Sequence, residues 1–272
     1  MYVALGAVCG SFAGVLGRFI PWNALTITGI RAIFAALLLG IVRRKFSLRI
    51  TRGNILGALG VSATGLLYMS ALKFTSAANA IVLQYAMPMF VIAFCWIFYK
   101  QKPGVSNLVT AAFVLLGIIL CSWEGISGGA GGKGHLLGDG LALLSAVTFS
   151  MVFFCSKLPD ADPQEYSYLG LVMCTPFALY GFFDPAMTLV PMQWGAAVLL
   201  ACSLGFGYFF MSKGMKLVSP ISAALISNLE PIMNPIWVFL FMGENPGMLT
   251  VAGAVIVLAA ATVYSLWEGK QS

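Results

Sequence analysis

The sequence predicts an all-α integral membrane protein with ten transmembrane helices in two inverted five-helix repeats, and with the N- and C-termini in the cytoplasm. Of its 272 residues, 60% are hydrophobic and 9% are charged, whereas a soluble domain carries about 25% charged residues. The apolar residues gather in ten segments, each close to the roughly 20 residues that a helix needs to cross a bilayer. The second five segments also repeat part of the sequence pattern of the first five, including the positions of prolines.

The ten segments are separated by short connections rich in Gly, Pro and charged residues. We expect transmembrane spans at residues 2–19, 23–42, 53–72, 75–99, 105–123, 137–157, 166–183, 193–213, 219–242 and 248–267. The longest connection, EGISGGAGGKGH, has the composition of a flexible linker. It divides the chain into a first repeat at residues 1–123, a linker at 124–136 and a second repeat at 137–272.

Orientation follows from the Lys and Arg residues in the connections, because cytoplasmic loops of membrane proteins carry an excess of them. With the N-terminus inside, the inner connections hold eleven: Arg43, Arg44, Lys45, Arg49, Arg52, Lys100, Lys102, Lys157, Lys213, Lys216 and Lys270. The outer connections hold three: Arg18, Lys73 and Lys133. This bias places both termini in the cytoplasm. It also indicates that the basic residues behind the net charge of +6 serve to orient the protein in the membrane rather than to bind nucleic acid.

The two halves of the chain share a pattern when one is shifted by 143 residues. The stretch LKFTSAANAIVLQYAMPMF then lies on MKLVSPISAALISNLEPIM without a gap, and Pro88 lies on Pro231. The Pro-Gly turns at 103–104 and 246–247 fall in the same frame. Five spans per half is an odd number, so the two copies must cross the membrane in opposite directions. Inverted repeats of this kind place substrate sites near the midplane, at the interface between the halves.

These features resemble the EamA-type branch of the drug/metabolite transporter superfamily over nearly the whole chain. The resemblance is carried by GIRAIFAALLLG, KFTSAANAIVLQYAMPMF, GDGLALLSAVTFS and LISNLEPIMNPIWVFLFMGENPG. The first half departs from the family pattern where it has YKQKPG, since the second half supplies the usual glycine-glutamate pair at Gly243 and Glu244. The resemblance implies ten helices and the transport of small metabolites, mostly outward and without ATP.

The span at 219–242 contains a carboxylate, Glu230, near the middle of the membrane. An ionised group at that depth costs roughly 2.5–3.5 kcal/mol on insertion scales, so it usually faces a cavity or a partner. Ser227, Glu230 and Asn234 follow helical spacing on one face, and Asn228 flanks them. We expect these polar residues to contact substrate, with Glu230 as the candidate for proton coupling. The alternative is a carboxylate satisfied by a neighbour, with no role in transport.

Three prolines predict broken helices in the two matching spans. Pro88, Pro231 and Pro235 each remove a backbone donor and free a carbonyl one turn earlier, and irregular backbone is tolerated in membranes where it lines a cavity. In the first half the matching stretch offers Gln84 and Tyr85 for contacts with substrate, with ordinary packing as the alternative for Tyr85. It has a methionine where the second half has its glutamate, so we expect one proton site rather than two.

Arg31 is the other charged residue expected inside the membrane, at a depth similar to that of Glu230. Three interpretations stay open. Arg31 pairs with Glu230 in one state, or it binds a carboxylate on the substrate, or it reaches towards the outer surface or caps a broken helix.

The remaining cavity candidates are aromatic or small. Tyr68 and Tyr208, in two further spans, supply aromatic walls that suit flat or amphipathic organic solutes. Gly6, Gly10 and Gly14 form a stripe of small residues in the first span. Such a stripe favours close packing of helices within the protein.

No enzyme motif is visible in the sequence. There is no GxxxxGK[ST] and no HExxH, and the single histidine, His135, falls in the linker, so a Ser-His-Asp set is lacking. The six cysteines lie within apolar segments without CxxC spacing, which supports neither a disulfide framework nor a zinc site. We therefore expect no catalytic residue, no metal and no cofactor.

The function we expect is a secondary transporter of the bacterial cytoplasmic (inner) membrane that exports small organic metabolites, amino acids or related compounds, by alternating access. Its partners would be a small-molecule substrate and the lipid bilayer, with protons as the candidate coupling ion and no nucleic acid. Facilitated diffusion is the uncoupled alternative. Two other functions stay open: an exchanger of phosphorylated or nucleotide-linked sugars, which would need several cations, and a non-transporting membrane assembly or lipid-handling protein.

Overall fold

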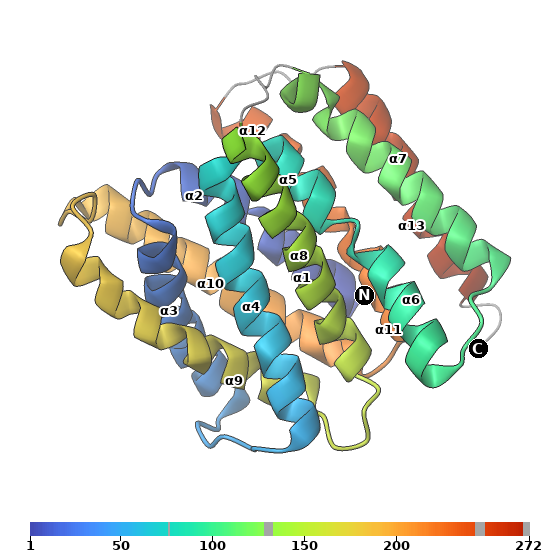
Figure 1. Ribbon diagram of the computed structural model, residues 1–272, viewed down its shortest axis with the longest axis horizontal. Helices are drawn as coiled ribbons and strands as arrows, with labels where there is room; N and C mark the ends of the chain where they lie inside the picture. The colour runs from blue at the N-terminus through green and yellow to red at the C-terminus, as the bar shows by residue number, and fades with distance from the viewer. Residues whose placement is uncertain (76, 128–132, 243–247, 269–272) are drawn as a thin grey trace.

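The computed structural model describes residues 1–75, 77–127, 133–242 and 248–268, and every regular element in these ranges is helical (Figure 1). Five of the described helical segments are long and apolar enough to cross a membrane by length and composition: Ala24–Arg43, Arg52–Phe74, Leu136–Cys155, Pro163–Phe183 and Pro191–Met215. Shorter apolar helices accompany them. The all-α architecture is confirmed over these ranges, and the count of ten spans stays a prediction.

Helices lie in each of the ten segments expected from the sequence. In the first half they are α1 (Tyr2–Ser11), α2 (Ala13–Arg18), α3 (Ala24–Arg43), α4 (Arg52–Phe74), α5 (Ala77–Gln84), α6 (Met87–Tyr99) and α7 (Val105–Ser127). In the second half they are α8 (Lys133–Cys155), α9 (Pro163–Cys174), the 3-10 helix η1 (Thr175–Phe183), α10 (Pro191–Met215), α11 (Pro220–Ser227), α12 (Leu229–Met242) and α13 (Met248–Glu268). Helices α7 and α8 thus extend from both sides into the expected linker.

Four of the ten segments hold a break rather than one continuous helix. The helical structure is interrupted at Phe12 between α1 and α2, at 85–86 between α5 and α6, and at Asn228 between α11 and α12. Helix α9 tightens into η1, where Pro176 removes a backbone donor. The breaks in the two matching spans come two or three residues before Pro88 and Pro231, which is consistent with the loss of regular helical bonding ahead of a proline.

The packing of the helices repeats between the two halves (Figure 1). The shift of 143 residues carries α5 onto α11, so the two matching spans break at equivalent places. Helix α4 packs against α8 and α9, and its counterpart α10 packs against α1 and α3. Helices α7 and α13, the last of each half, pack against each other. The structure is therefore built from two similar sets of helices, one with α4, α8 and α9 and the other with α10, α1 and α3, and each set takes helices from both halves of the chain.

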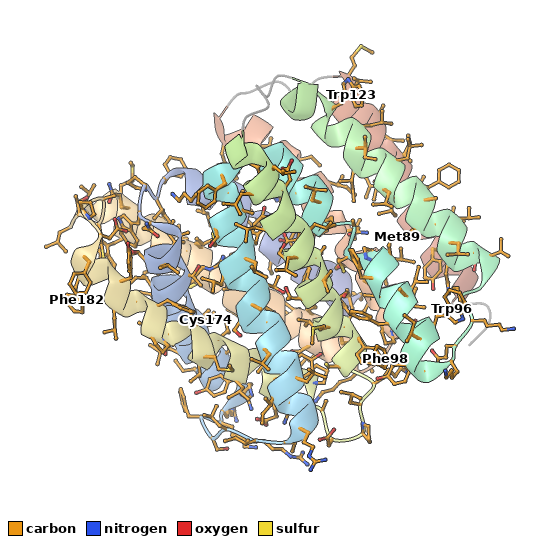
Figure 2. The ribbon with its side chains drawn as sticks, viewed as in Figure 1. Met89, Trp96, Phe98, Trp123, Cys174 and Phe182 are labelled. Atoms are coloured by element: carbon orange, nitrogen blue, oxygen red, sulfur yellow. The ribbon has the colours of Figure 1, made fainter. Side chains whose placement is uncertain are left out.

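The surface of the helices carries many large apolar side chains. Figure 2 labels Met89, Trp96 and Phe98 on α6, Trp123 on α7 and Phe182 on η1. All five side chains are exposed, that of Phe182 by 86%. In water such exposure would be costly. Within a bilayer the same side chains face hydrocarbon, which is the arrangement expected of a membrane-embedded bundle.

One end of the molecule, here called the basic end, is formed by residues 43–54, 156–166 and 213–219. Asn54 is fully buried there and accepts a hydrogen bond from the backbone N–H of Asp162 at 2.8 Å. The Asp162 carboxylate accepts from Lys216 Nζ at 2.7 Å, and Arg43 pairs with Glu165 at 2.6 Å. Burial alone would raise the pKa of Asp162, but the hydrogen bonds and the charge of Lys216 outweigh it and hold that pKa below its usual value. Polar contacts therefore tie the two halves together at the basic end.

The ion pair between Asp162 and Lys216 makes the stability of the protein depend on pH. Because the pKa of Asp162 is lower in the folded protein, its contribution is present above the unfolded-state pKa, about 3.9, and is lost as pH falls through the folded value. We expect Asp162→Asn to lower the melting temperature of the purified protein at pH 7. The loss in free energy of unfolding should be no more than about 1 kcal/mol, because both side chains of the pair are partly exposed. The difference should shrink below about pH 4.

Asn is a matched replacement because it can still cap α9, where Asp162 accepts from the backbone N–H of Gln164 at 2.8 Å. Lys216→Gln should give the same pH profile, and the double variant should be no worse than either single one. A difference from the wild type that stays constant between pH 3 and pH 7 would show that the ion pair is not its cause.

The other end of the molecule, here called the opposite end, is formed by residues 19–24, 73–75 and 184–193. Trp22 is fully buried and donates from its indole N–H to Gln193 at 2.9 Å. The backbone N–H of Asn23 donates to Asp184 at 2.6 Å, and Lys73 Nζ donates to the Trp22 carbonyl at 3.1 Å. The bonds to Gln193 and Asp184 also join the two halves, so each end has its own set of polar contacts between them.

Candidate functional site

Two adjoining cavities lie between the two sets of helices. The inner cavity encloses about 110 Å³ and is bordered by residues of α1 to α5, α8, α10 and α12. The outer cavity encloses about 310 Å³ and continues to Ile20, Ala24 and Lys73 at the opposite end. Both cavities share Tyr68, Glu230 and several neighbours. Together they form one path from the centre of the molecule towards the opposite end.

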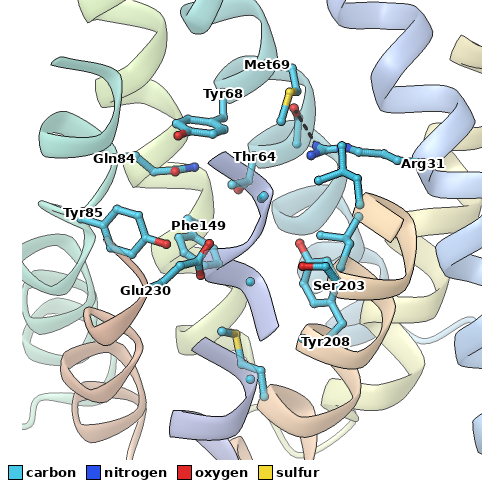
Figure 3. A pocket seen from close by; sticks show the side chains of 18 residues that line it. Arg31, Thr64, Tyr68, Met69, Gln84, Tyr85, Phe149, Ser203, Tyr208 and Glu230 are labelled. Atoms are coloured by element: carbon cyan, nitrogen blue, oxygen red, sulfur yellow. Dashed lines mark hydrogen bonds between the residues drawn. The ribbon is translucent and has the colours of Figure 1, made fainter. Parts of the chain in front are cut away.

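Glu230 stands in the first turn of α12, directly after the break at Asn228, and borders both cavities. Figure 3 shows the Tyr85 hydroxyl pointing at its carboxylate, and the two side chains form a hydrogen bond. Tyr85 itself is buried and lies in the matching break of the first half, between α5 and α6. The carboxylate is thus held between residues from both halves. Among the described residues that line the two cavities, Glu230 is the only acid.

Gly10 on α1 explains how the carboxylate fits. A Cβ atom at this position would lie 2.7 Å from Oε2 and 2.8 Å from Cδ of Glu230. At Gly6, one turn earlier, a Cβ would lie 2.9 Å from the backbone carbonyl of Gly207 on α10. The small residues of α1 therefore allow one close contact with a helix backbone and one with a charged side chain.

Arg31 on α3 borders the inner cavity from another side (Figure 3). Its Nη2 donates to the carbonyl of Gly65 at 3.4 Å, which is longer than a usual N–H···O bond of 2.7–3.2 Å. A Cβ at Gly65 would lie 3.2 Å from the same nitrogen. Within the described ranges Arg31 forms no ion pair, so the predicted pairing with Glu230 is absent from this conformation.

The walls between these two charges are mainly aromatic and apolar. Tyr68, Tyr208 and Phe149 border the inner cavity, and Gln84 adds an amide (Figure 3). Ser203 also borders it, but its hydroxyl donates to the carbonyl of Cys9 and so joins α10 to α1. A cavity with apolar walls and a few polar groups suits a small organic solute.

Two of the predicted polar residues border neither cavity. The Ser227 hydroxyl donates back to the carbonyl of Ala224 at 2.8 Å within α11. Asn228 is fully buried at the break, and its amide has no hydrogen-bond partner among the described residues. Of the prolines, Pro231 borders the outer cavity and Pro88 is buried near the start of α6. The side chains of Asn234, Pro235 and His135, and the surroundings of Gly14, lie outside the part of the structure that is described.

Several residues of the inner cavity were not singled out from the sequence as contacts, among them Thr64, Phe149 and Ser203. Phe149 lies within GDGLALLSAVTFS, one of the stretches that carries the family resemblance. The sequence therefore drew attention to this stretch but did not indicate that Phe149 borders the cavity. Gly10 was expected to pack against a helix, and its contact with a carboxylate had no signal in the sequence. No group of His, Cys, Asp or Glu in the described residues is arranged to hold a metal ion.

Two similar sets of apolar helices around a central cavity with a few polar groups are features of a multi-pass membrane transporter. The model of the EamA-like transporter family matches residues 1–123 and 136–266. The chain therefore belongs to the EamA-like transporter family, as the resemblance in its sequence indicated.

Several relatives extend this result. The uncharacterized inner membrane transporter YicL of Salmonella typhimurium is 23% identical, over 97% of this chain and 94% of its own. The pseudopaline exporter CntI of Pseudomonas aeruginosa is 23% identical, over 89% and 86%. Solute carrier family 35 member G1 of Mus musculus is 24% identical, over 96% and 76%. A protein of known crystal structure, 18% identical, has the same fold with a TM-score of 0.84 over 99% of this chain and 97% of that one.

Proposed function

We propose that this membrane transporter exports small organic metabolites, amino acids or related compounds, from the bacterial cytoplasm by alternating access. The observation that carries the proposal is the cavity between the two sets of helices, which holds Arg31 and Glu230 away from the lipid. A charged residue inside a membrane usually marks a path for substrate or ions. The names of two relatives, an exporter and an inner membrane transporter, support the direction and the location.

The proposed topology has ten spans in two inverted repeats, with the basic end in the cytoplasm. The excess of Lys and Arg at that end supports the orientation. The cavities continue to the opposite end, while polar contacts around Asp162 tie the basic end together. In this orientation the structure represents an outward-facing conformation. The two halves would then rock about the central cavity to expose it to the cytoplasm.

Glu230 is the proposed site of proton coupling. It is the only acid among the described residues that line the cavities, and the equivalent position in the first half is Met87. A carboxylate that faces a cavity can exchange its proton with whichever side the cavity reaches. Transport without coupling is the alternative that the same geometry allows.

Efflux from proteoliposomes tests the proposed function. The purified protein is reconstituted with a mixed pool of metabolites inside, and mass spectrometry follows what leaves, with protein-free liposomes as the control. We expect a subset of the small organic solutes to leave faster than from the control. If no solute leaves faster, with or without a pH gradient, the protein is not a transporter of this kind.

A further inference from the structure

The inner cavity holds two charged side chains of opposite sign that face the same space. Arg31 comes from α3 in the first half and Glu230 comes from α12 in the second, and Figure 3 shows them on different sides of the cavity. They are the only charged residues among the described residues that line it. The cavity therefore offers one cation and one anion, and its formal charge is balanced.

Neither charge has a counter-ion within the described ranges. The guanidinium of Arg31 has five N–H donors, and its hydrogen bond to the Gly65 carbonyl, at 3.4 Å, is long. The carboxylate of Glu230 can accept about four hydrogen bonds, and its side-chain partner is the neutral hydroxyl of Tyr85. Charges inside a membrane usually pair with one another or with a ligand. Both groups thus keep free capacity for a partner that enters the cavity.

We propose that the cavity recognises zwitterionic solutes, with an anionic group of the solute at Arg31 and a cationic group at Glu230. This inference rests on the proposed transport function and names its substrate class. A carboxylate suits the planar fork of a guanidinium, and a primary ammonium can donate to Glu230. The body of the solute would lie against Tyr68, Tyr208 and Phe149, which supply apolar surface between the two charges.

Solutes with one kind of charge fit this cavity less well. A carboxylic acid without an amine leaves Glu230 without a partner, and an amine without an acid leaves Arg31 without one. An unpaired charge in a poorly solvated site is costly. A phosphorylated sugar brings about two negative charges to a cavity that has one cation and a carboxylate. The charge pattern therefore disfavours the exchange of sugar phosphates.

The location of the two residues also suggests why both ends of the solute matter. Arg31 lies on α3 and Glu230 on α12, so a zwitterion would contact two separate helices at once. A ligand shifts a conformational equilibrium only by its difference in affinity between two states. A solute that contacts only one of the two charges supplies less of this difference.

The test measures which charge class is transported. Proteoliposomes are loaded with an equimolar mixture of amino acids, simple carboxylic acids and primary amines, and efflux of each class is followed. The zwitterion that leaves fastest is then compared with its carboxamide and its N-acetyl derivative, which keep the same body and remove one charge each. We expect both derivatives to leave at least about tenfold more slowly, as the loss of one charged contact implies.

Two variants assign each charge to its residue. Arg31→Gln should remove the preference for the free acid over the carboxamide, and Glu230→Gln should remove the preference for the free amine over the N-acetyl form. Lys102→Gln, on the exposed surface outside both cavities, should keep both preferences. Preserved preferences in Arg31→Gln and Glu230→Gln would overturn the assignment.

The outcomes separate this inference from the proposed function. If carboxylic acids or amines leave faster than zwitterions from wild-type proteoliposomes, the inference is wrong and the transport function stands. If nothing leaves, the transport function fails and the inference fails with it. The comparison of charge classes uses the wild-type protein, so it holds even where a variant folds poorly.

Discussion

Replacing Glu230 with Gln is expected to abolish the response of transport to an imposed proton gradient. Gln keeps the size of the side chain and can still bond to Tyr85, but it cannot take up a proton at neutral pH. One pH unit across the membrane supplies ~1.4 kcal/mol per proton, which is about tenfold in the accumulation ratio of a carrier that couples one proton to one solute. The variant should show no such gain in proteoliposomes held at several inside and outside pH values.

A matched control is Asp139→Asn. Asp139 accepts a hydrogen bond from the Thr75 hydroxyl at 2.6 Å, away from both cavities. Its replacement also removes a single carboxylate, and we expect the gradient response to stay. An unchanged response in Glu230→Gln would remove Glu230 from the coupling role, and the same rates at all gradients in the wild type would favour facilitated diffusion.

Adding one methyl group at Gly10 should have a similarly large effect on transport. The Cβ of Gly10→Ala would lie within 2.7–2.9 Å of three atoms of the Glu230 carboxyl group, closer than ordinary van der Waals contact. The carboxylate must move or α1 must shift, and overpacking of this kind costs about 1–3 kcal/mol. We expect the efflux rate to fall at least about tenfold, because the group that faces the cavity is displaced.

Gly140→Ala is the matched control for this change. Gly140 lies on the exposed side of α8, where a Cβ would meet nothing within 4 Å. Melting temperature measured beside efflux separates a local effect from a loss of folding. Wild-type efflux in Gly10→Ala would mean that the contact between α1 and Glu230 does not matter for transport.

The positions of the described helices could be predicted in large part from the sequence. Each described helix lies in or overlaps an apolar segment of the sequence. Such segments predict helices because a backbone that crosses lipid must satisfy its hydrogen bonds internally. The break at Phe12 and the 3-10 helix η1 were not predicted. Pro176 is the second residue of η1, and a proline inside an apolar segment is compatible with a bent, tightened or broken helix.

The site was predictable only in part. Helical spacing placed Ser227 and Glu230 on one face, but that argument assumes a continuous helix. The break at Asn228 divides them between α11 and α12, and the Ser227 hydroxyl bonds within its own helix. The contact between Gly10 and Glu230 joins residues 220 positions apart in the chain, so it depends on how the two halves pack and has no local signature.

The relative movement of the two ends tests the central claim, alternating access, most directly. In a variant without native cysteines, one pair of spin labels spans the basic end at Leu48 and Leu217, and another spans the opposite end at Phe74 and Met192. All four residues are exposed. Pulsed electron resonance then measures both distances with and without a transported solute. We expect the distance at the basic end to lengthen in the same population in which the distance at the opposite end shortens. Distances that stay fixed, or that change together in one direction, would contradict alternating access.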